Sequence, residues 1–214
     1  MSRRDLILAN TAVLAPPHVP EIRLHLADEA HDLWQKTEAE LDAIGLPPPF
    51  WAFAWAGGQA LARHVLDHPD TLAGQAVIDF ASGSGLVGIA AALAGAGSVT
   101  AVDTDPFCEE AIRLNAALNG VALLHDGRDR IGSEVVADML LAGDVFFDRE
   151  LAERLIPWFD DLARAGITVL VGDPGRAYLP RDRLDHLATY MVPVTRALED
   201  SEIKRSAVWR WRPV

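Results

Sequence analysis

Residues 77–86 have the sequence Val-Ile-Asp-Phe-Ala-Ser-Gly-Ser-Gly-Leu, and residues 101–106 have the sequence Ala-Val-Asp-Thr-Asp-Pro. The first stretch begins with apolar, β-branched residues, as in a strand that is covered on both faces. Its two glycines allow a sharp backbone turn and a close approach to a ligand. The apolar run 86–94 predicts a packed helix, and a second strand over 99–102 ends on aspartates. The pattern predicts a nucleotide-binding β-α-β unit.

Two kinds of ligand are compatible with this unit. Gly83-x-Gly85-x-x-Gly88, with Asp103 twenty residues beyond Gly83, matches the dinucleotide fingerprint of an NAD-dependent oxidoreductase. However, Asp79 lies inside the first strand, where a carboxylate would repel a pyrophosphate but attract an ammonium group. Neither tyrosine is followed by a lysine four residues later, as a dehydrogenase of this kind would require. An aspartate before the glycine turn and another at the end of the next strand favour S-adenosylmethionine, which carries an ammonium group and a ribose diol but no phosphate.

The length and composition predict a single domain of residues 1–214, with residues 1–48 as an N-terminal cap segment and residues 49–214 as the core. Half of the 214 residues are hydrophobic, which is enough for a sheet covered by helices. No apolar run approaches the roughly 18 residues of a membrane span. Cys108 is the single cysteine, so we expect no internal disulfide and no metal site. These features favour a cytoplasmic location, with an organellar matrix as the alternative, and no membrane as a partner.

The charge of the chain narrows the range of partners. The formal net charge of −12 argues against a nucleic-acid backbone as a partner. The acidity belongs to the first 175 residues, because from Arg176 onward basic residues outnumber acidic ones. A negative surface there would suit a basic protein substrate.

Alternation of strands and helices continues along the chain and predicts an α/β fold with a doubly wound, mostly parallel sheet. We expect an N-terminal helical cap, and two apolar stretches near the C-terminus predict a closing β-hairpin. The predicted strands are 21–27 at an edge, 121–124, 138–143, 167–171 and, in the hairpin, 191–195 and 207–211. The predicted helices are 28–44, a helix that follows a flexible Gly57-Gly58 and ends near Leu66, 105–119, 149–165 and 183–189.

Ligands of doubly wound sheets bind at the carboxyl ends of the strands. Gly83, Asp103, Asp129, Asp144 and Asp173 all lie at or just beyond such predicted ends. Each aspartate alone could instead cap a helix, and for Asp144 a cap on the following helix is the alternative. Together they predict a site at this edge.

An aromatic segment precedes the glycine turn. Four aromatic residues lie within residues 50–55 and are followed by Gly57-Gly58. They are typical of a packed lid over the sheet edge, and they would equally form a wall beside a ligand pocket. The two interpretations are compatible, because a lid must pack in order to exclude water.

Five blocks give the chain its family resemblance. They are Pro49-Phe-Trp-Ala-Phe-Ala-Trp-Ala-Gly-Gly-Gln-Ala-Leu61, Asp79-Phe-Ala-Ser-Gly-Ser-Gly85, Asp103-Thr-Asp-Pro106, Gly143-Asp-Val-Phe-Phe-Asp148 and Val171-Gly-Asp-Pro-Gly-Arg176. With these, the chain resembles the seven-β-strand methyltransferases of class I. Within them it is similar to the bacterial form of the lysine methyltransferases that modify the electron-transfer flavoprotein β-subunit. The resemblance implies a seven-stranded sheet and S-adenosylmethionine as methyl donor, with S-adenosylhomocysteine as product.

The resemblance also implies roles for single residues. Asp79, Gly83 and Gly85 would hold the methionine end of the donor, and Asp103 the ribose hydroxyls. Asp129 would reach the adenine amine, a place that Asp126 could also take. The donor pocket would be bordered by two further residues, Trp55 and Gly57. Asp144 and Phe147 match the Asp-x-x-Tyr/Phe signature expected near the target lysine, although Phe147 has no hydroxyl to act as a catalytic group.

Two details of the expected site depend on physical chemistry. Ala81 replaces the first glycine of the usual Gly-x-Gly-x-Gly turn, which is harmless if this position keeps ordinary strand dihedrals. A free lysine has a pKa near 10.4, so holding its amine neutral at pH 7 costs about 4.6 kcal/mol. Because a carboxylate raises the pKa of a nearby amine, we expect Asp144 to orient the amine rather than to act as a strong base.

A related methyltransferase that acts on a ribosomal protein or a small amine remains the alternative.

Overall fold

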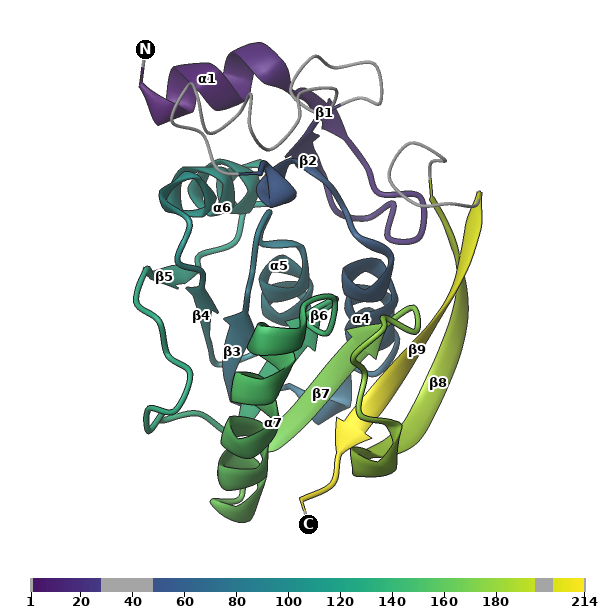
Figure 1. Ribbon diagram of the computed structural model, residues 1–214. Helices are drawn as coiled ribbons and strands as arrows, with labels where there is room; N and C mark the ends of the chain where they lie inside the picture. Colours follow the sequence, from purple (N-terminus) through teal and green to yellow (C-terminus); the bar gives the residue numbers. More distant parts are fainter. Residues whose placement is uncertain (1, 28–47, 195–201, 214) are drawn as a thin grey trace.

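The computed structural model of the protein describes residues 2–27, 48–194 and 202–213. Its seven-stranded sheet has the order β5-β4-β3-β6-β7-β9-β8, as Figure 1 shows. The five parallel strands are β3 (Ala76–Phe80), β4 (Ser98–Val102), β5 (Leu124–Asp126), β6 (Met139–Gly143) and β7 (Thr168–Asp173). The antiparallel hairpin of β8 (Leu184–Pro193) and β9 (Ile203–Trp211) completes the sheet. The predicted doubly wound, mostly parallel sheet with a C-terminal hairpin is therefore confirmed.

Helices cover both faces of the sheet. Helices α4 (Ala56–Asp67), α5 (Leu86–Leu93) and α6 (Pro106–Leu118) lie on one face, and α7 (Arg149–Arg164) lies on the other (Figure 1). The sheet has one hydrophobic core on each face, and successive residues of β3 belong to different cores. Val77 packs with α4 and α5, whereas Ile78 packs with α7. No helix among the described residues is long and apolar enough to cross a membrane.

The N-terminal segment lies beyond the end of the sheet. Helix α1 (Arg3–Asn10) packs against α6, and the short strands β1 (Ala12–Leu14) and β2 (Leu24–Leu26) pair with each other. The strand predicted over 21–27 is therefore present but belongs to this separate two-stranded sheet, not to an edge of the main sheet. The helix predicted over 28–44 lies outside the described residues.

Three local predictions were wrong, for identifiable reasons. Residues 183–189 are not a helix: η3 (Arg181–Arg183) is a single 3-10 turn, and β8 follows it. A register irregularity between His186 and Ala188 breaks the alternation by which this edge strand would have been recognised. The third parallel strand, β5, begins three residues later than predicted. The glycine pair before the fourth helix is not a flexible link but forms the first turn of α4.

Those two glycines bring α4 unusually close to the sheet. A Cβ on Gly57 would overlap the carbonyl oxygen of Gly172 in β7 and would lie 2.6 Å from Oδ2 of Asp144. On Gly143, at the end of β6, a Cβ would lie 2.8 Å from the Cα of Gly58. Backbone therefore packs on backbone where the N-terminus of α4 crosses the carboxyl ends of β6 and β7.

We predict that Gly57→Ala destabilises the protein by about 3 kcal/mol, because the added methyl group forces α4 away from β7. Gly58→Ala is the matched control: the nearest heavy atom to a Cβ at Gly58 is 4.0 Å away, on Val87. We expect its free energy of unfolding to stay within about 1 kcal/mol of the wild-type value. Chemical denaturation followed by circular dichroism measures both, and equal losses in the two variants would contradict the close-packing interpretation.

Candidate active site

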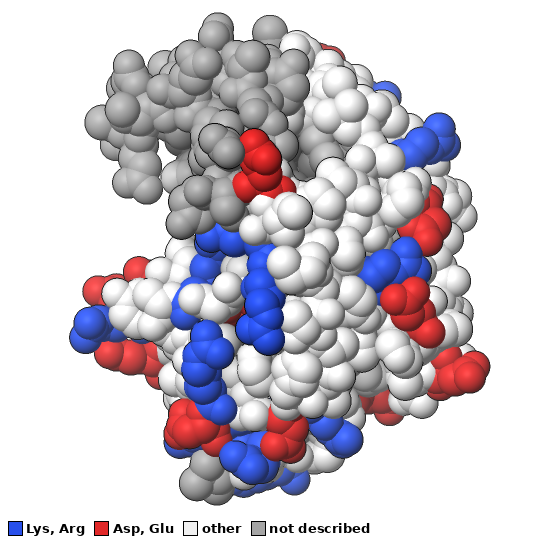
Figure 2. Space-filling model, turned by 90° about the vertical axis from the view of Figure 1, so that its right-hand side faces the viewer, with Lys and Arg blue, Asp and Glu red and all other residues white. Residues whose placement is uncertain are grey.

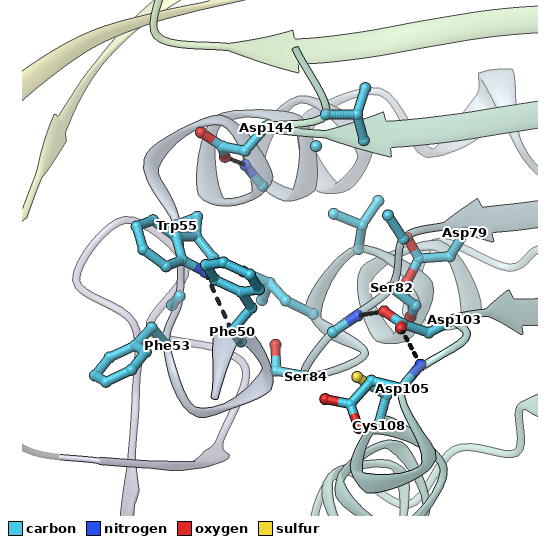
Figure 3. A pocket seen from close by; sticks show the side chains of 18 of the residues that line it. Phe50, Phe53, Trp55, Asp79, Ser82, Ser84, Asp103, Asp105, Cys108 and Asp144 are labelled. Carbon is cyan, nitrogen blue, oxygen red and sulfur yellow. Dashed lines mark hydrogen bonds between the residues drawn. The ribbon is translucent and has the colours of Figure 1, made fainter. Parts of the chain in front are cut away.

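A cavity of about 340 Å³ opens at the carboxyl ends of β3, β4 and β6. Its volume is in the range of small-molecule sites. Figure 3 shows carboxylates on one side, from the ends of β3 and β4 and the start of α6, and aromatic side chains with Asp144 on the other. The residues that line it are Phe50, Phe53, Ala54, Trp55, Gly58, Asp79, Ala81, Ser82, Gly83, Ser84, Leu86, Val87, Asp103, Asp105, Cys108, Gly143, Asp144, Val145, Phe147, Leu151 and Arg176.

Asp79 is a buried carboxylate in the wall of this cavity. Its side chain is held by two donors to Oδ2, the hydroxyl of Ser82 at 2.5 Å and the backbone N–H of Gly88 at 2.8 Å. Burial nevertheless raises the pKa of Asp79 to about 7, with Asp103 adding to the increase. The two hydrogen bonds therefore do not compensate for the loss of water, and a cationic ligand group would favour the ionised form.

Asp103, at the end of β4, joins the two halves of the β-α-β unit. Its Oδ2 accepts from the N–H of Gly83 at 2.8 Å, and its Oδ1 accepts from the N–H of Asp105 at 3.0 Å. Asp105 lies in the cavity wall and also caps α6, as expected, by accepting from the N–H of Phe107. Burial raises the pKa of Asp105 as well. This side of the cavity thus carries three carboxyl groups, those of Asp79, Asp103 and Asp105.

The turn between β3 and α5 differs from the sequence expectation at one position. Ala81 does not keep strand dihedrals: its φ is +52°, in the left-handed region. This conformation costs a residue with a Cβ about 1 kcal/mol, a cost that the glycine usual at this position would avoid. The replacement is therefore tolerated rather than harmless.

An aromatic wall faces the carboxylates. The ring of Phe50 lies 5.9 Å from that of Trp55 and 5.9 Å from that of Phe147, measured between centroids. The indole N–H of Trp55 donates to the carbonyl oxygen of Phe50 at 3.1 Å. Phe50 and Phe147 are about half exposed, at 47% and 52%, so they form the outer part of the wall. The segment predicted as a lid or wall therefore forms a wall of the cavity.

Asp144 connects this wall with the sheet. It has a left-handed φ of +58° immediately after β6, a conformation that aspartate tolerates better than most residues. Its Oδ2 accepts from the N–H of Gly58 at 2.9 Å, in the first turn of α4, where the helix dipole favours a negative charge. The helix after β6, α7, is capped by Asp148 instead. Asp144 is thus not the cap of the following helix.

Arg176 completes the arrangement around Asp144. Its Nη2 and Nε donate to Oδ1 of Asp144 at 2.7 and 3.1 Å, and its guanidinium carbon lies 5.8 Å from the ring of Trp55. The sequence marked Arg176 only as the end of a motif. Its role was missed because it depends on a loop that folds back to a residue 32 positions earlier.

The structure brings together most of the predicted site residues, namely Trp55, Asp79, Gly83, Asp103, Asp144 and Phe147. Gly57 and Gly85 lie behind the cavity wall, where Gly57 packs on β7 and Gly85 adopts the left-handed conformation that starts α5. Asp129 does not line the cavity, and its carboxylate pairs with Arg154. Asp126 does not line it either: ion pairs with Arg128 and Arg130 lower its pKa to about 2.

Comparisons with known proteins identify the family of this chain. The sequence model of the family "Ribosomal protein L11 methyltransferase (PrmA)" matches residues 60–155. The electron transfer flavoprotein beta subunit lysine methyltransferase of Xenopus laevis is 38% identical over 217 residues, which cover 98% of this chain and 87% of that protein. That of Homo sapiens is 33% identical over 214 residues, covering 91% and 76%. The chain belongs to the family of electron transfer flavoprotein beta subunit lysine methyltransferases.

Solved structures place the fold of this methyltransferase. A ribosomal protein L11 methylase from Lactobacillus delbrueckii subsp. bulgaricus is similar with a TM-score of 0.53 at 19% identity, covering 76% of this chain and 81% of that one. Magnesium protoporphyrin IX methyltransferase from Synechocystis, solved with bound SAM, has a TM-score of 0.53 at 18% identity, covering 73% and 80%. At these identities the likeness establishes the class I methyltransferase fold.

We predict that the methyltransferase binds S-adenosylhomocysteine more weakly as the pH falls below about 7. If the ammonium group of this ligand binds Asp79, it prefers the ionised carboxylate, and the pKa of about 7 means that Asp79 becomes protonated near neutrality. Below that pH the affinity should fall about tenfold per pH unit, and above it the affinity should level off. Calorimetric titration between pH 5.5 and 8.5 measures this.

Asp79→Asn is the control variant for this pH dependence. The amide can keep both hydrogen bonds but carries no charge, so binding should be weak and independent of pH. Because the pKa of the native carboxyl lies above its unfolded value of 3.8, Asp79 contributes less stability as the pH rises from about 4 to 7. The variant should therefore be more stable than the wild type at pH 8. Unchanged pH dependence in Asp79→Asn would remove Asp79 from the explanation.

Proposed function

We propose that this protein is an S-adenosylmethionine-dependent protein-lysine N-methyltransferase that acts on the electron-transfer flavoprotein β-subunit. The observation that carries the proposal is the division of one cavity into an acidic side and an aromatic side that contains Asp144. Membership of the family and the class I fold support it.

The acidic side fits the donor. Asp79 is a buried carboxylate held by two neutral donors, a hydroxyl and a backbone N–H, which suits the ammonium group of the methionine end. Asp103 would bind the ribose hydroxyls, and Gly83 would let the backbone approach the ligand. Gly85 and Gly57 would act indirectly, through the turn and the packing of α4. We assign no donor contact to Asp129, because its carboxylate faces Arg154.

The aromatic side fits the target lysine. Phe50, Trp55 and Phe147 would surround the aliphatic part of the side chain and exclude water, and their faces would favour a methylated ammonium by cation–π contact. Asp144, held by Gly58 and Arg176, would accept a hydrogen bond from the amine and direct its lone pair. When bound, the donor supplies a methyl group: the amine lone pair forms the N–CH₃ bond and the electron pair of the S–CH₃ bond stays on sulfur.

The choice of substrate rests on the extent of the similarity. The ribosomal protein L11 methyltransferase model matches residues 60–155, which contain the donor side but not the aromatic segment or Arg176. The flavoprotein β-subunit methyltransferases match nearly the whole chain. We therefore prefer the flavoprotein β-subunit to a ribosomal protein. An NAD-dependent oxidoreductase is disfavoured, since a pyrophosphate would lie beside the buried carboxylate of Asp79.

We also propose that the enzyme works in the cytoplasm on a protein and not on nucleic acid. The net charge of −12 opposes binding to phosphates. The single cysteine, Cys108, is free and buried, in keeping with a reducing compartment. The proposal includes no metal: among residues 2–27, 48–194 and 202–213, no group of His, Cys, Asp and Glu is arranged to hold one.

We predict that purified electron-transfer flavoprotein β-subunit gains mass in methyl-sized steps when incubated with this protein and S-adenosylmethionine. Asp144→Ala should lower the rate at least about 100-fold, because the amine loses its orienting acceptor, while S-adenosylhomocysteine binding stays within about threefold. Intact-mass spectrometry and calorimetry measure the two effects.

Asp148→Ala is the matched control for this experiment. Asp148 lies in the same loop but caps α7, so its loss should reduce stability by about 1 kcal/mol and leave transfer intact. If the mass does not change but the ligand binds, another protein is the substrate. If the ligand does not bind, the assignment of the acidic side is wrong.

A further inference from the structure

Arg176 is held in place by the turn that follows β7. The N–H groups of Gly175 and Arg176 donate to Oδ1 of Asp173 at 2.6 and 2.7 Å. Asp173 is 1% exposed, and Gly175 has a φ of +95°, which favours glycine. Asp173 therefore fixes the backbone of Arg176, and the turn directs the Arg176 side chain toward Asp144.

The guanidinium is in turn held by two groups of the cavity wall. It donates through two nitrogens to one oxygen of Asp144 and lies 5.8 Å from the ring centroid of Trp55. The other oxygen of Asp144 accepts from the N–H of Gly58, and a carboxylate oxygen can accept more than one hydrogen bond. The carboxylate that faces the target amine is thus half of an ion pair.

This pairing removes a physical difficulty of the reaction. A lone carboxylate within about 4–6 Å of an amine raises the pKa of that amine by about one to three units and so favours its unreactive, protonated form. Asp144 and Arg176 together carry no net charge. Asp144 can then orient the N–H bonds of the lysine while the guanidinium opposes its protonation.

The guanidinium need not slow the transfer itself. Protonation of the lysine adds a positive charge to the cavity, whereas methyl transfer only moves one from sulfur to nitrogen. A nearby cation opposes protonation of the lysine with the whole electrostatic potential that it produces at the amine nitrogen. It affects methyl transfer only by the difference between its potential at the sulfur and its potential at the nitrogen.

We propose that Arg176 is a positioning residue that keeps the target lysine deprotonated, by neutralising Asp144 while it holds that carboxylate in place. The inference rests on the proposed lysine methyltransferase function. It adds a role for the last residue of the Gly-Asp-Pro-Gly-Arg motif.

The test is the pH profile of the transfer rate at saturating S-adenosylmethionine, between pH 7 and 10, for the wild type, Arg176→Gln and Arg176→Lys. In Arg176→Gln the acidic limb should move to higher pH by about one unit or more. Its rate should then be at least about tenfold below wild type at pH 7.5 and recover toward wild type near pH 10. Arg176→Lys retains a cation, so its limb should stay near the wild-type position even if its maximum rate falls.

Other titratable groups do not obscure this window. Those that line the cavity besides Asp144 are Asp79, Asp103, Asp105 and Cys108. A bound cation lowers the pKa of Asp79 from about 7, and burial raises the pKa of Cys108. Behind the pair, burial raises the pKa of Asp173 to about 6, below the range of the measurement.

Two further variants separate an electrostatic role from a structural one. Arg149→Gln removes a different guanidinium, which lies over the ring of Tyr178. Tyr178 belongs to the same loop as Arg176, and we expect the pH profile of the transfer rate to stay unchanged. In Arg176→Gln/Asp144→Asn the uncompensated carboxylate is also gone, so the acidic limb should move back toward wild type although the maximum rate is low. Melting temperature and S-adenosylhomocysteine affinity confirm that each variant is folded.

The outcomes distinguish this inference from the function on which it rests. If the wild type transfers no methyl group, the proposed function fails and the role of Arg176 fails with it. If the wild type is active but Arg176→Gln loses the same factor at every pH, only the role of Arg176 is overturned. If Arg176→Gln does not fold, Arg176→Lys still tests the inference. A shift of its acidic limb to higher pH by about one pH unit would overturn the proposed role of Arg176.

Discussion

The close contact between α4 and the ends of β6 and β7 is the constraint on which the rest of the site depends. Glycines on both sides of the contact leave no room for a Cβ and allow backbone to meet backbone, and they are Gly57, Gly143 and Gly172. This contact places the N-terminus of α4 beside the left-handed turn at Asp144, whose carboxylate accepts from that helix end. Trp55, the residue before α4, is thereby set opposite Arg176. One helix terminus thus positions both the acceptor and its aromatic surroundings.

A second constraint acts against stability. Asp79 is buried in β3, whose other buried residues are apolar, and its pKa of about 7 shows that its two hydrogen bonds do not offset the loss of hydration. An asparagine there could make the same hydrogen bonds without a charge. The carboxylate is therefore best explained by a ligand that brings the missing positive charge, and this is an argument for function drawn from an unfavourable feature of the fold.

The sequence predicted those parts of the structure that local signals determine. β3, α5 and β4 follow from β-branched runs and turn glycines, and the cap of α6 follows from Asp105-Pro106. The rule that ligands bind at the carboxyl ends of parallel strands led to Gly83, Asp103 and Asp144, which line the cavity, but also to Asp129 and Asp173, which do not. What failed depends on tertiary contacts. Ala81 is left-handed because hydrogen bonds from Ser82 and Gly83 to the end of β4 impose the turn, and no propensity of alanine indicates this.

Arg176 shows the same limit for function. Its motif is visible in the sequence, but whether an arginine after a strand meets solvent or a carboxylate such as Asp144 is decided by how the next loop folds. The ion pair also changes the electrostatic effect of Asp144, because an unpaired carboxylate would raise the pKa of a lysine bound beside it. With the pair neutral, the cavity has its negative charge on the side proposed for the cationic donor and little net charge on the side proposed for the neutral amine. A uniformly acidic cleft would bind both the donor and the target lysine as cations. The division of the cavity would instead let the donor bind as a cation and the lysine as a neutral amine.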